Sequence, residues 1–314
     1  MSTHTPILHH YAFSTFSEKV RTVLGFKKIN WQSVDVPGLP PRPFLSPLTG
    51  GYRRIPILQI GADIYCDTNI ILPALDRLFP NSPTLYPAGS EGVARGLSFS
   101  WERQMWIPTI GILVHYIGEH IPPEFLKDRK EAYLMIDISK EAMAPQFEHY
   151  VGLVRSQYAW LAQALAQRPY VLGDAPSAVD FSCWQTIFLL RKNCPPEVDS
   201  LLGIGPDSAV LRWYDRIAAF GHGSFKEVTP QDALEAAKMA TPEPVRHIRA
   251  GDGDKRTKVG ARVTVTPDDN ARVPVTGILL AADDNEIIIR QSDNTLGDIH
   301  IHFPSLGFDL VETQ

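Results

Sequence analysis

Two serines with the potential for chemistry, Ser14 and Ser17, lie where a short apolar run gives way to a charged helical pattern. The first N–H groups of a helix have no partner inside it, and the helix dipole makes that end positive. A hydroxyl there can stabilise an anion such as a thiolate. The pKa of a free thiol is about 8.5, and each unit of lowering needs roughly 1.4 kcal/mol of preference for the charged form. The alternative is that the serines only cap the helix, a role that suits Ser17 especially.

A second candidate is the segment Arg53-Arg54-Ile55-Pro56, which leads into an apolar run. A proline at the entry to a strand cannot donate to the sheet, so it belongs at an edge or in a special turn. A cis bond between Ile55 and Pro56 would turn the N–H and C=O groups of Ile55 outward, where they can pair with a peptide-like ligand. The alternative is an ordinary trans proline in an edge strand.

The third candidate is the pair Asp67-Thr68, placed directly before an expected helix. Thr68 can offer its hydroxyl and N–H groups to a carboxylate at the helix N-terminus. Asp67 can accept from an ammonium group, so together they suit the amino-acid end of a γ-glutamyl group. The alternative is that they form an N-cap and nothing more.

Taken in order, these motifs resemble the glutathione transferase superfamily. They read Ser-x-x-Ser-x-Lys-Val-Arg from Ser14, Arg-Ile-Pro-Ile-Leu from Arg54, and Asp-Thr-Asn-Ile-Ile from Asp67. The resemblance extends over about residues 5–240 and implies glutathione as co-substrate. It implies that Ser14, with Ser17 as runner-up, supplies the hydroxyl that activates the glutathione thiol.

The resemblance also implies the other site residues. Ile55 would pair with the cysteinyl backbone of glutathione, and Arg54 would reach its glycyl carboxylate. The implied glutathione-binding residues are Phe16, Arg54, Ile55, Pro56, Asp67 and Thr68. The implied walls of an electrophile pocket are Trp101, Met105, Trp106 and Ile110, although core packing explains most of these four.

The elements that position these residues follow from apolar periodicity. Residues 5–86 alternate strand and helix patterns, including an expected helix over about Thr68–Leu78, and predict an α/β arrangement with a small mixed sheet. The resemblance implies that residues 1–86 form a thioredoxin-like, glutathione-binding domain. A linker rich in Pro, Ser and Gly follows, and residues 93–241 predict an all-helical domain without strands. Within it, Ser177 and Asp180 form the Ser-x-x-Asp pattern of a capping box, so Asp180 is predicted to be structural rather than catalytic.

Residues 245–314 lie beyond the resemblance and contain five short β-like runs separated by turn residues. They predict a small antiparallel barrel or meander, closed to avoid exposed edges. We expect this segment to be a separate domain that docks on the helical domain or on a dimer mate. Cutting the chain after about Pro244 should then leave a folded protein that still binds glutathione.

Composition excludes several classes. The formal net charge is −5, so no global basic field favours nucleic acid or an acidic membrane surface. No apolar run reaches the roughly 18 residues of a spanning helix, and no signal peptide is expected. The three cysteines are too few and scattered for a disulfide framework, so a reduced, cytoplasmic protein is expected. His300 and His302 alternate as metal ligands do, but no third ligand is evident and no metal is expected.

These observations predict a glutathione-dependent transferase or lyase that attacks a small, apolar electrophile, and the resemblance implies a homodimer. The alternative is a non-catalytic glutathione transferase-like scaffold, which the extra β segment favours. A glutathione-dependent thiol oxidoreductase would need a cysteine at the active turn, where this chain has serines.

Overall fold

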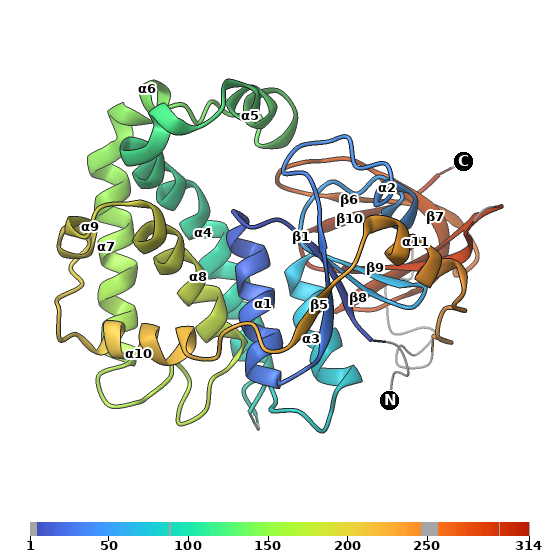
Figure 1. Cartoon of the computed structure of the whole chain (residues 1–314), viewed down its shortest axis with the longest axis horizontal. Coiled ribbons are helices and arrows are strands. Elements are labelled where there is room, and N and C mark those ends of the chain that lie inside the picture. The colour runs from blue at the N-terminus through green and yellow to red at the C-terminus, as the bar shows by residue number, and fades with distance from the viewer. Residues whose placement is uncertain (1–4, 88, 246–256, 295, 314) are drawn as a thin grey trace. The chain divides into compact units, whose positions relative to one another are not determined.

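The computed structural model describes residues 5–87, 89–245, 257–294 and 296–313 (Figure 1). The chain divides into two compact units. The sheet unit contains Met1–Val20, Lys28–Pro80 and Ser224–Gln314, and the helical unit contains Arg21–Lys27 and Asn81–Gly223. The C-terminal strands therefore group with the N-terminal α/β segment, unlike the separate domain expected for residues 245–314.

The first part of the sheet unit is the predicted thioredoxin-like arrangement. Its strands are β1 (Ile7–His10), β2 (Trp31–Asp35), β3 (Ile57–Ile60) and β4 (Asp63–Cys66). Its helices are α1 (Thr15–Lys27), whose second half groups with the helical unit, α2 (Ser46–Thr49) and α3 (Thr68–Leu78). Strand β1 pairs in parallel with β2 and antiparallel with β3, and β4 completes a hairpin with β3.

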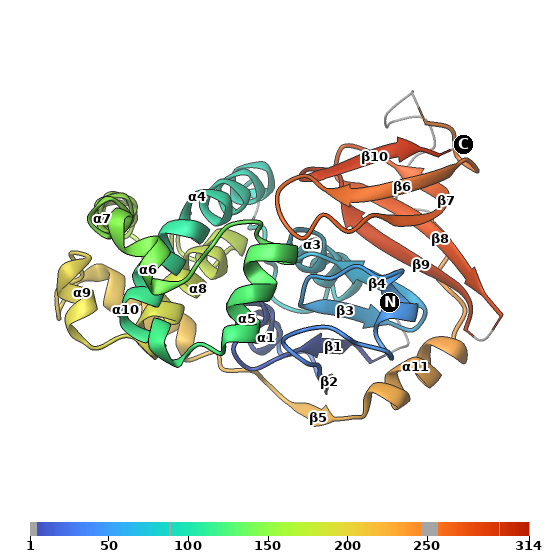
Figure 2. The same ribbon diagram turned by 90° about the horizontal axis from the view of Figure 1, so that it is seen from above.

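The C-terminal extension, described over residues 257–294 and 296–313, continues the same sheet. Its strands are β6 (Arg262–Pro267), β7 (Val275–Ala282), β8 (Glu286–Asp293), β9 (Gly297–Pro304) and β10 (Phe308–Glu312). Strand β9 pairs in parallel with β4, which gives one ten-stranded sheet in the order β10-β6-β7-β8-β9-β4-β3-β1-β2-β5 (Figure 2). The antiparallel strands are confirmed. The closed barrel is wrong, because the edge of β9 that a barrel would close is paired with β4.

Apolar packing explains why the extension joins the sheet. Alternate residues of β7 are buried, and one apolar cluster contains Leu48 and Ile64 together with Val265, Ile289 and Phe303 of the extension. Gly50, at φ +60°, shows how closely the extension approaches the residue that follows α2. A Cβ atom there would lie 2.3 Å from the side-chain nitrogen of Gln291 and 2.6 Å from a methyl carbon of Val275.

The sheet unit also includes a strand that the sequence analysis missed. Strand β5 (Phe225–Glu227) pairs in parallel with β2 and is followed by α11 (Pro230–Lys238). The expectation of an all-helical domain through residue 241 is therefore corrected. The reason is physical: all three residues of β5 are exposed, so the strand has no buried alternation to reveal it.

The helical unit is built mainly on three helices: α4 (Glu91–Ile117), α7 (Phe147–Ala164) and α8 (Ala178–Asn193). Its shorter helices are α5 (Pro123–Asp128), α6 (Lys140–Met143), α9 (Glu197–Leu201) and α10 (Ala209–Ala218). Short 3-10 helices lie at Gly118–His120 and Ala144–Gln146, and a π-helical turn lies at Arg129–Tyr133. The predicted apolar stripe of α7 is buried at Val151, Val154, Tyr158 and Leu161.

The predicted capping box at the start of α8 is confirmed. The Asp180 carboxylate accepts from the Ser177 N–H at 2.9 Å and its hydroxyl at 2.8 Å. It also accepts from the Val171 N–H at 2.9 Å and the Trp213 indole at 2.8 Å. Burial raises the pKa of Asp180 despite these four hydrogen bonds. With every contact used to join segments of the helical unit, Asp180 has a structural role.

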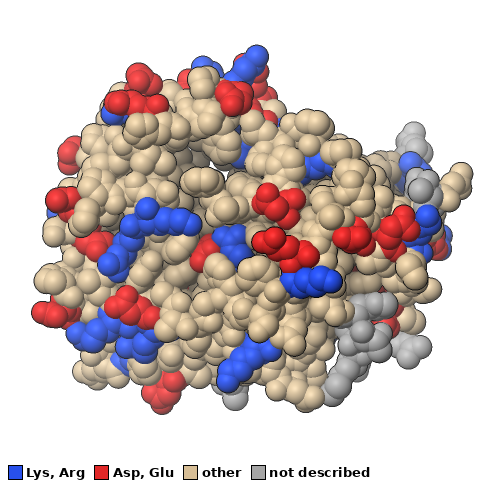
Figure 3. All heavy atoms as spheres, in the orientation of Figure 1, with Lys and Arg blue, Asp and Glu red and all other residues tan. Residues whose placement is uncertain are grey.

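Two surface properties bear on the expected partners. Among the residues that the structure describes, no helix is both long and apolar enough to cross a bilayer. Figure 3 shows Lys and Arg interspersed with Asp and Glu on the drawn face. That face carries no extended area of one sign.

Candidate functional site

The sheet register brings the three predicted motifs to one end of the sheet unit. His9 of β1 lies opposite Ile57 of β3, and Ile57 lies opposite Cys66 of β4. Ser14 follows β1, Ile55-Pro56 precedes β3, and Asp67-Thr68 follows β4. The motifs, scattered over more than fifty residues of sequence, are therefore assembled by the pairing of three short strands.

Ser14 holds the N-terminus of α1. Its hydroxyl oxygen accepts from the Ser17 N–H at 3.1 Å, and its carbonyl accepts from the Glu18 N–H at 3.0 Å. Accepting with a lone pair leaves the hydroxyl proton available to donate to an anion. Ser14 is 7% exposed. It can therefore cap the helix and stabilise a thiolate at once.

Ser17 does not cap the helix, contrary to the alternative considered above. It lies inside the first turn of α1 with 0% exposure. Its hydroxyl has no hydrogen-bond partner among the described residues. Of the two serines, Ser14 is therefore the one with exposed surface.

The Ile55–Pro56 bond is cis, so the alternative of an ordinary trans proline is wrong. Ile55 is 8% exposed and Pro56 directly precedes β3. Phe16, the other apolar residue assigned to the site, is partly buried on α1, where the Lys19 ammonium lies 5.9 Å from its ring centroid.

Asp67 and Thr68 open α3. The Asp67 carboxylate accepts from the Asn69 N–H at 2.9 Å, so Asp67 is the N-cap, with φ at 91°. Thr68 is the first helical residue and is 4% exposed. The capping role is thus established, and it occupies one carboxylate oxygen, Oδ1. The second, Oδ2, faces Arg54 at 3.7 Å.

Arg54 has partners that the sequence did not suggest. Its guanidinium forms an ion pair with Asp269 and donates to the Asn270 carbonyl, both in the loop between β6 and β7. It also lies 5.8 Å from the ring centroid of Phe308. The side chains of Arg54 and Asp269 are only 14% and 26% exposed. Sequence reasoning treated residues 267–270 as a turn, and no local signal links them to a residue 215 positions away.

The same loop borders a small cavity of about 110 Å³ beside α2. Arg42, Arg53 and Val273 are among its lining residues. The guanidinium of Arg42 donates to the carbonyls of Pro37, Arg53 and Gly38 at 2.8, 2.7 and 3.2 Å. Arg42 therefore fixes the loop that precedes β3, and the extension covers that loop.

The four residues assigned to an electrophile pocket lie on α4 in the helical unit. Trp101 donates to the Thr186 hydroxyl at 3.3 Å and stacks on Tyr158, with 6.3 Å between ring centroids. Met105 is 1% and Ile110 8% exposed, and Trp106 is partly buried. Trp101 thus packs between α7 and α8, and the pocket assignment of all four stays a prediction.

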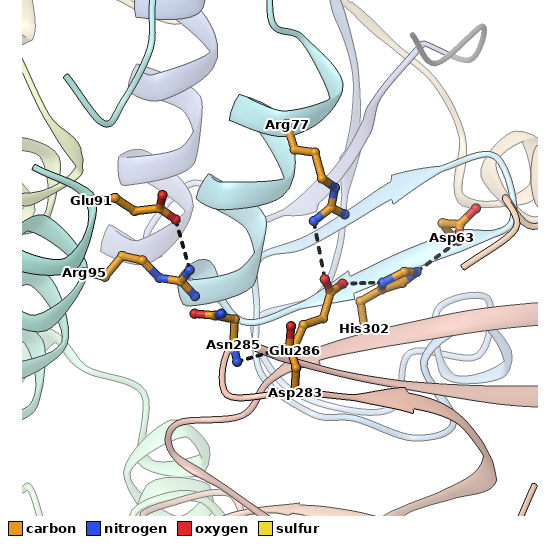
Figure 4. Close-up of polar contacts among 8 residues, drawn as sticks. All are labelled: Asp63, Arg77, Glu91, Arg95, Asp283, Asn285, Glu286 and His302. Atoms are coloured by element: carbon orange, nitrogen blue, oxygen red, sulfur yellow. Dashed lines mark hydrogen bonds and ion pairs between the residues drawn. The ribbon is translucent and has the colours of Figure 1, made fainter. Parts of the chain in front are cut away.

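His302 belongs to a buried polar cluster between the extension and β4 (Figure 4). Its Nδ1 lies 2.6 Å from Glu286 Oε1, and its Nε2 lies 2.9 Å from Asp63 Oδ1. Arg77 of α3 reaches Glu286 at 3.3 Å. Among the residues described, no group of His, Cys, Asp and Glu is arranged to hold a metal ion. In the sequence, only the histidines were considered as metal ligands. Glu286 and Asp63 could not be linked to His302, because they lie 16 and 239 positions from it along the chain.

The pKa of each of the three cysteine thiols is raised above its ordinary value. Burial raises the pKa of the Cys66 and Cys183 thiols well above their ordinary value, with nearby carboxylates adding to the effect. Burial also raises the pKa of Cys194 to about 12. All three therefore remain protonated thiols at neutral pH.

Comparison with known proteins identifies the family. Residues 8–83 match the glutathione S-transferase N-terminal domain, and residues 144–216 match the glutathione S-transferase C-terminal domain. A GST-like protein of known structure from Pseudomonas syringae is 33% identical to this chain, with a TM-score of 0.77. That match covers 98% of this chain and 100% of the other, so it includes the extension.

Two other solved structures share the fold at lower identity. FzlA from C. crescentus is 20% identical, with a TM-score of 0.52 over 68% of this chain and 88% of its own. A transferase from Ceriporiopsis subvermispora in complex with glutathione is 17% identical, with a TM-score of 0.54 over 69% of this chain and 96% of its own. A search of curated proteins found no match. The family domains and the full-length relative show that this chain belongs to the glutathione transferase superfamily.

Proposed function

We propose that this protein is a glutathione-dependent transferase or lyase in which Ser14 stabilises the glutathione thiolate. The thiolate attacks an electrophilic carbon of a small, apolar co-substrate, and a leaving group departs with the bonding electron pair. The protein orients the thiolate and keeps water from it. Glutathione serves as co-substrate and no metal takes part.

The hydrogen bonding of Ser14 carries this proposal. Its oxygen already accepts from the Ser17 N–H at 3.1 Å, which leaves the hydroxyl proton for donation to a ligand thiolate. The N-terminus of α1 adds a positive potential that favours the charged form of a thiol. The backbone of Ile55 and the N-terminus of α3 at Thr68 lie at the same end of the sheet, where a peptide-like ligand can be held.

The alternative function is a non-catalytic binding or scaffolding role, to which the extension would contribute surface outside the family domains. The proposed enzyme acts in the cytoplasm as a homodimer. A nucleic acid or a membrane is not among its proposed partners.

Replacing Ser14 with alanine tests the catalytic role. Turnover with a generic aryl halide should fall by about ten- to a hundredfold, because one charge-assisted hydrogen bond to sulfur is lost. Affinity for glutathione should change little. Ser17→Ala is the matched control and should keep the wild-type rate, since the Ser17 hydroxyl is buried inside the first turn.

Retention on immobilised glutathione separates enzyme from scaffold. Binding without turnover on any electrophile would favour the scaffold. If Ser17→Ala loses rate and Ser14→Ala does not, the activating hydroxyl is that of Ser17 and the proposal has named the wrong serine. Thr68→Val should weaken binding while the saturated rate survives, because Thr68 would act on ground and transition states alike.

A further inference from the structure

The extension places the carboxylate of Asp269 against the guanidinium of Arg54. Arg54 is the residue that the family resemblance assigns to the glycyl carboxylate of glutathione. Arg54 pairs with Asp269 and donates to the Asn270 carbonyl. Those two contacts use Nη2 of Arg54, and its Nη1 lies 3.7 Å from Oδ2 of Asp67. The guanidinium of Arg54 is therefore shared between two carboxylates of the protein itself, those of Asp67 and Asp269.

We propose that Asp269 is a specificity-determining residue that denies Arg54 to the glycyl carboxylate of glutathione. The site then recognises the γ-glutamyl-cysteinyl part of a thiol ligand and gains nothing from a free glycyl carboxylate. This inference rests on the proposed function, because it concerns the same ligand in the same site. The substrate class it names is γ-glutamyl thiols whose C-terminal end is absent, uncharged or held elsewhere.

Burial is the first reason why a glycyl carboxylate cannot simply join this arrangement. The side chains of Arg54, Asp67 and Asp269 are 14%, 16% and 26% exposed. Solvent screens the charges of such groups poorly, so a third carboxylate would be repelled by the two already present. Binding on Arg54 would require Asp269 to leave, and its carboxylate would lose a charge-assisted hydrogen bond.

The position of the loop is the second reason. Residues 268–274 connect β6 to β7, and both strands have buried apolar residues that anchor the loop at its two ends. The Arg272 guanidinium donates to the Asp268 carbonyl at 3.0 Å, and Val273 lines the cavity beside α2. The loop is thus held at both ends and by a hydrogen bond within itself, and both Asp269 and Asn270 contact Arg54. Displacing Asp269 would therefore disturb more than one contact.

Calorimetric titration of the full chain with three thiols tests the proposal: glutathione, γ-glutamylcysteine, and glutathione esterified at its glycyl carboxylate. The wild-type protein should bind all three with dissociation constants within about twofold of one another. In Asp269→Asn, glutathione should bind about tenfold more tightly, because Arg54 becomes available to its carboxylate. Affinity for the other two thiols should stay within about twofold.

Asp309→Asn is the matched control. Asp309 is also an extension carboxylate paired with an arginine, at 3.3 Å from Arg272, but both side chains are 55% exposed. This variant removes the same charge and should bind all three thiols as the wild type does. Asp269→Ala repeats the test without an amide, and thermal melting reports whether each variant is folded.

Three results would overturn the inference. Wild-type protein that binds glutathione about tenfold more tightly than γ-glutamylcysteine already uses its glycyl carboxylate. Equal tightening of all three thiols in Asp269→Asn would place Arg54 at the γ-glutamyl end. Folded protein that binds none of the thiols, in wild type and variants alike, would refute the proposed function as well, which distinguishes that failure from the first two.

Discussion

Replacing His302 with phenylalanine should destabilise the junction between the extension and β4. The side chain of His302 is 3% exposed and bridges Asp63 and Glu286, whose side chains are 5% and 4% exposed. Phenylalanine keeps a ring of similar shape. It cannot donate to either carboxylate, so the variant isolates the polar contacts from the packing.

The magnitude follows from what each carboxylate keeps. Removing one partner from a buried pair costs about 3–5 kcal/mol. Glu286 retains Arg77 at 3.3 Å, and Asp63 retains the Glu243 N–H at 2.9 Å. Because both carboxylates keep one partner, we expect the lower end of that range, about 3 kcal/mol.

The effect should depend on pH. Burial by itself lowers the pKa of His302, but hydrogen bonds and charges from Asp63 and Glu286 outweigh it and raise the pKa above 6.5. The other charged or titratable groups nearby are His300, Arg77 and Tyr65. Tyr65 stacks on His302 with 4.3 Å between ring centroids, and burial raises its pKa, so it stays neutral over the range considered. The stabilising contribution is fully present below about pH 6.5, the unfolded value. Above it, the folded state binds the extra proton, so stability falls by up to about 1.4 kcal/mol per pH unit until the folded pKa is passed.

Urea unfolding of wild type and His302→Phe at pH 6.0, 7.5 and 9.0 measures both predictions. Hydrogen exchange of residues 297–304 reports the junction itself. His300→Gln is the control. His300 lies 3.7 Å from Asp63 with its side chain 13% exposed, so its replacement should cost about 1 kcal/mol or less. A deficit below about 1 kcal/mol in His302→Phe, or one that grows as pH rises, would refute the reasoning.

Two further predictions concern the same unit. Burial lowers the pKa of His9 to about 4, so stability should fall as pH drops from 6.5 toward 4, and His9→Asn should reduce that loss by up to about 3 kcal/mol in acid unfolding curves. Cutting the chain after Pro244 should give aggregated protein in size-exclusion chromatography, and not the folded protein expected from the sequence, because the cut uncovers β4 and the apolar cluster shared with the extension. A soluble, monodisperse truncated protein would show instead that the extension is separable.

Much of the local structure could be predicted because its signals lie within a few residues of one another. The helix predicted over Thr68–Leu78 has those bounds in the structure, and each of the five β-like runs of the extension is a strand. The capping box at Ser177 was recognisable for the same reason, since a cap depends on a residue three positions away.

The contacts that decide how the extension is used could not be predicted, because they join residues far apart in sequence. The parallel pairing of Tyr65 with His302 leaves no pattern in either strand. The sequence marked Arg54 as a candidate site residue, but its partner Asp269 looked like one of several turn carboxylates. Strand β5 was missed because all three of its residues are exposed, so it lacks the alternation of apolar and polar residues that indicates a half-buried strand.

The edge of β4 explains why one segment affects both stability and the candidate site. Without the extension, β4 would end the sheet and present unpaired N–H and C=O groups, which promote aggregation. Pairing β9 in parallel with β4 removes that edge and leaves β10 and the three-residue β5 as the outer strands. Strand β4 runs directly into Asp67, and β6 and β7 share the extension's sheet with β9. The segment that covers the edge therefore also carries Asp269 to Arg54. In our proposal, ligand recognition at this site is tied to the same packing that completes the sheet.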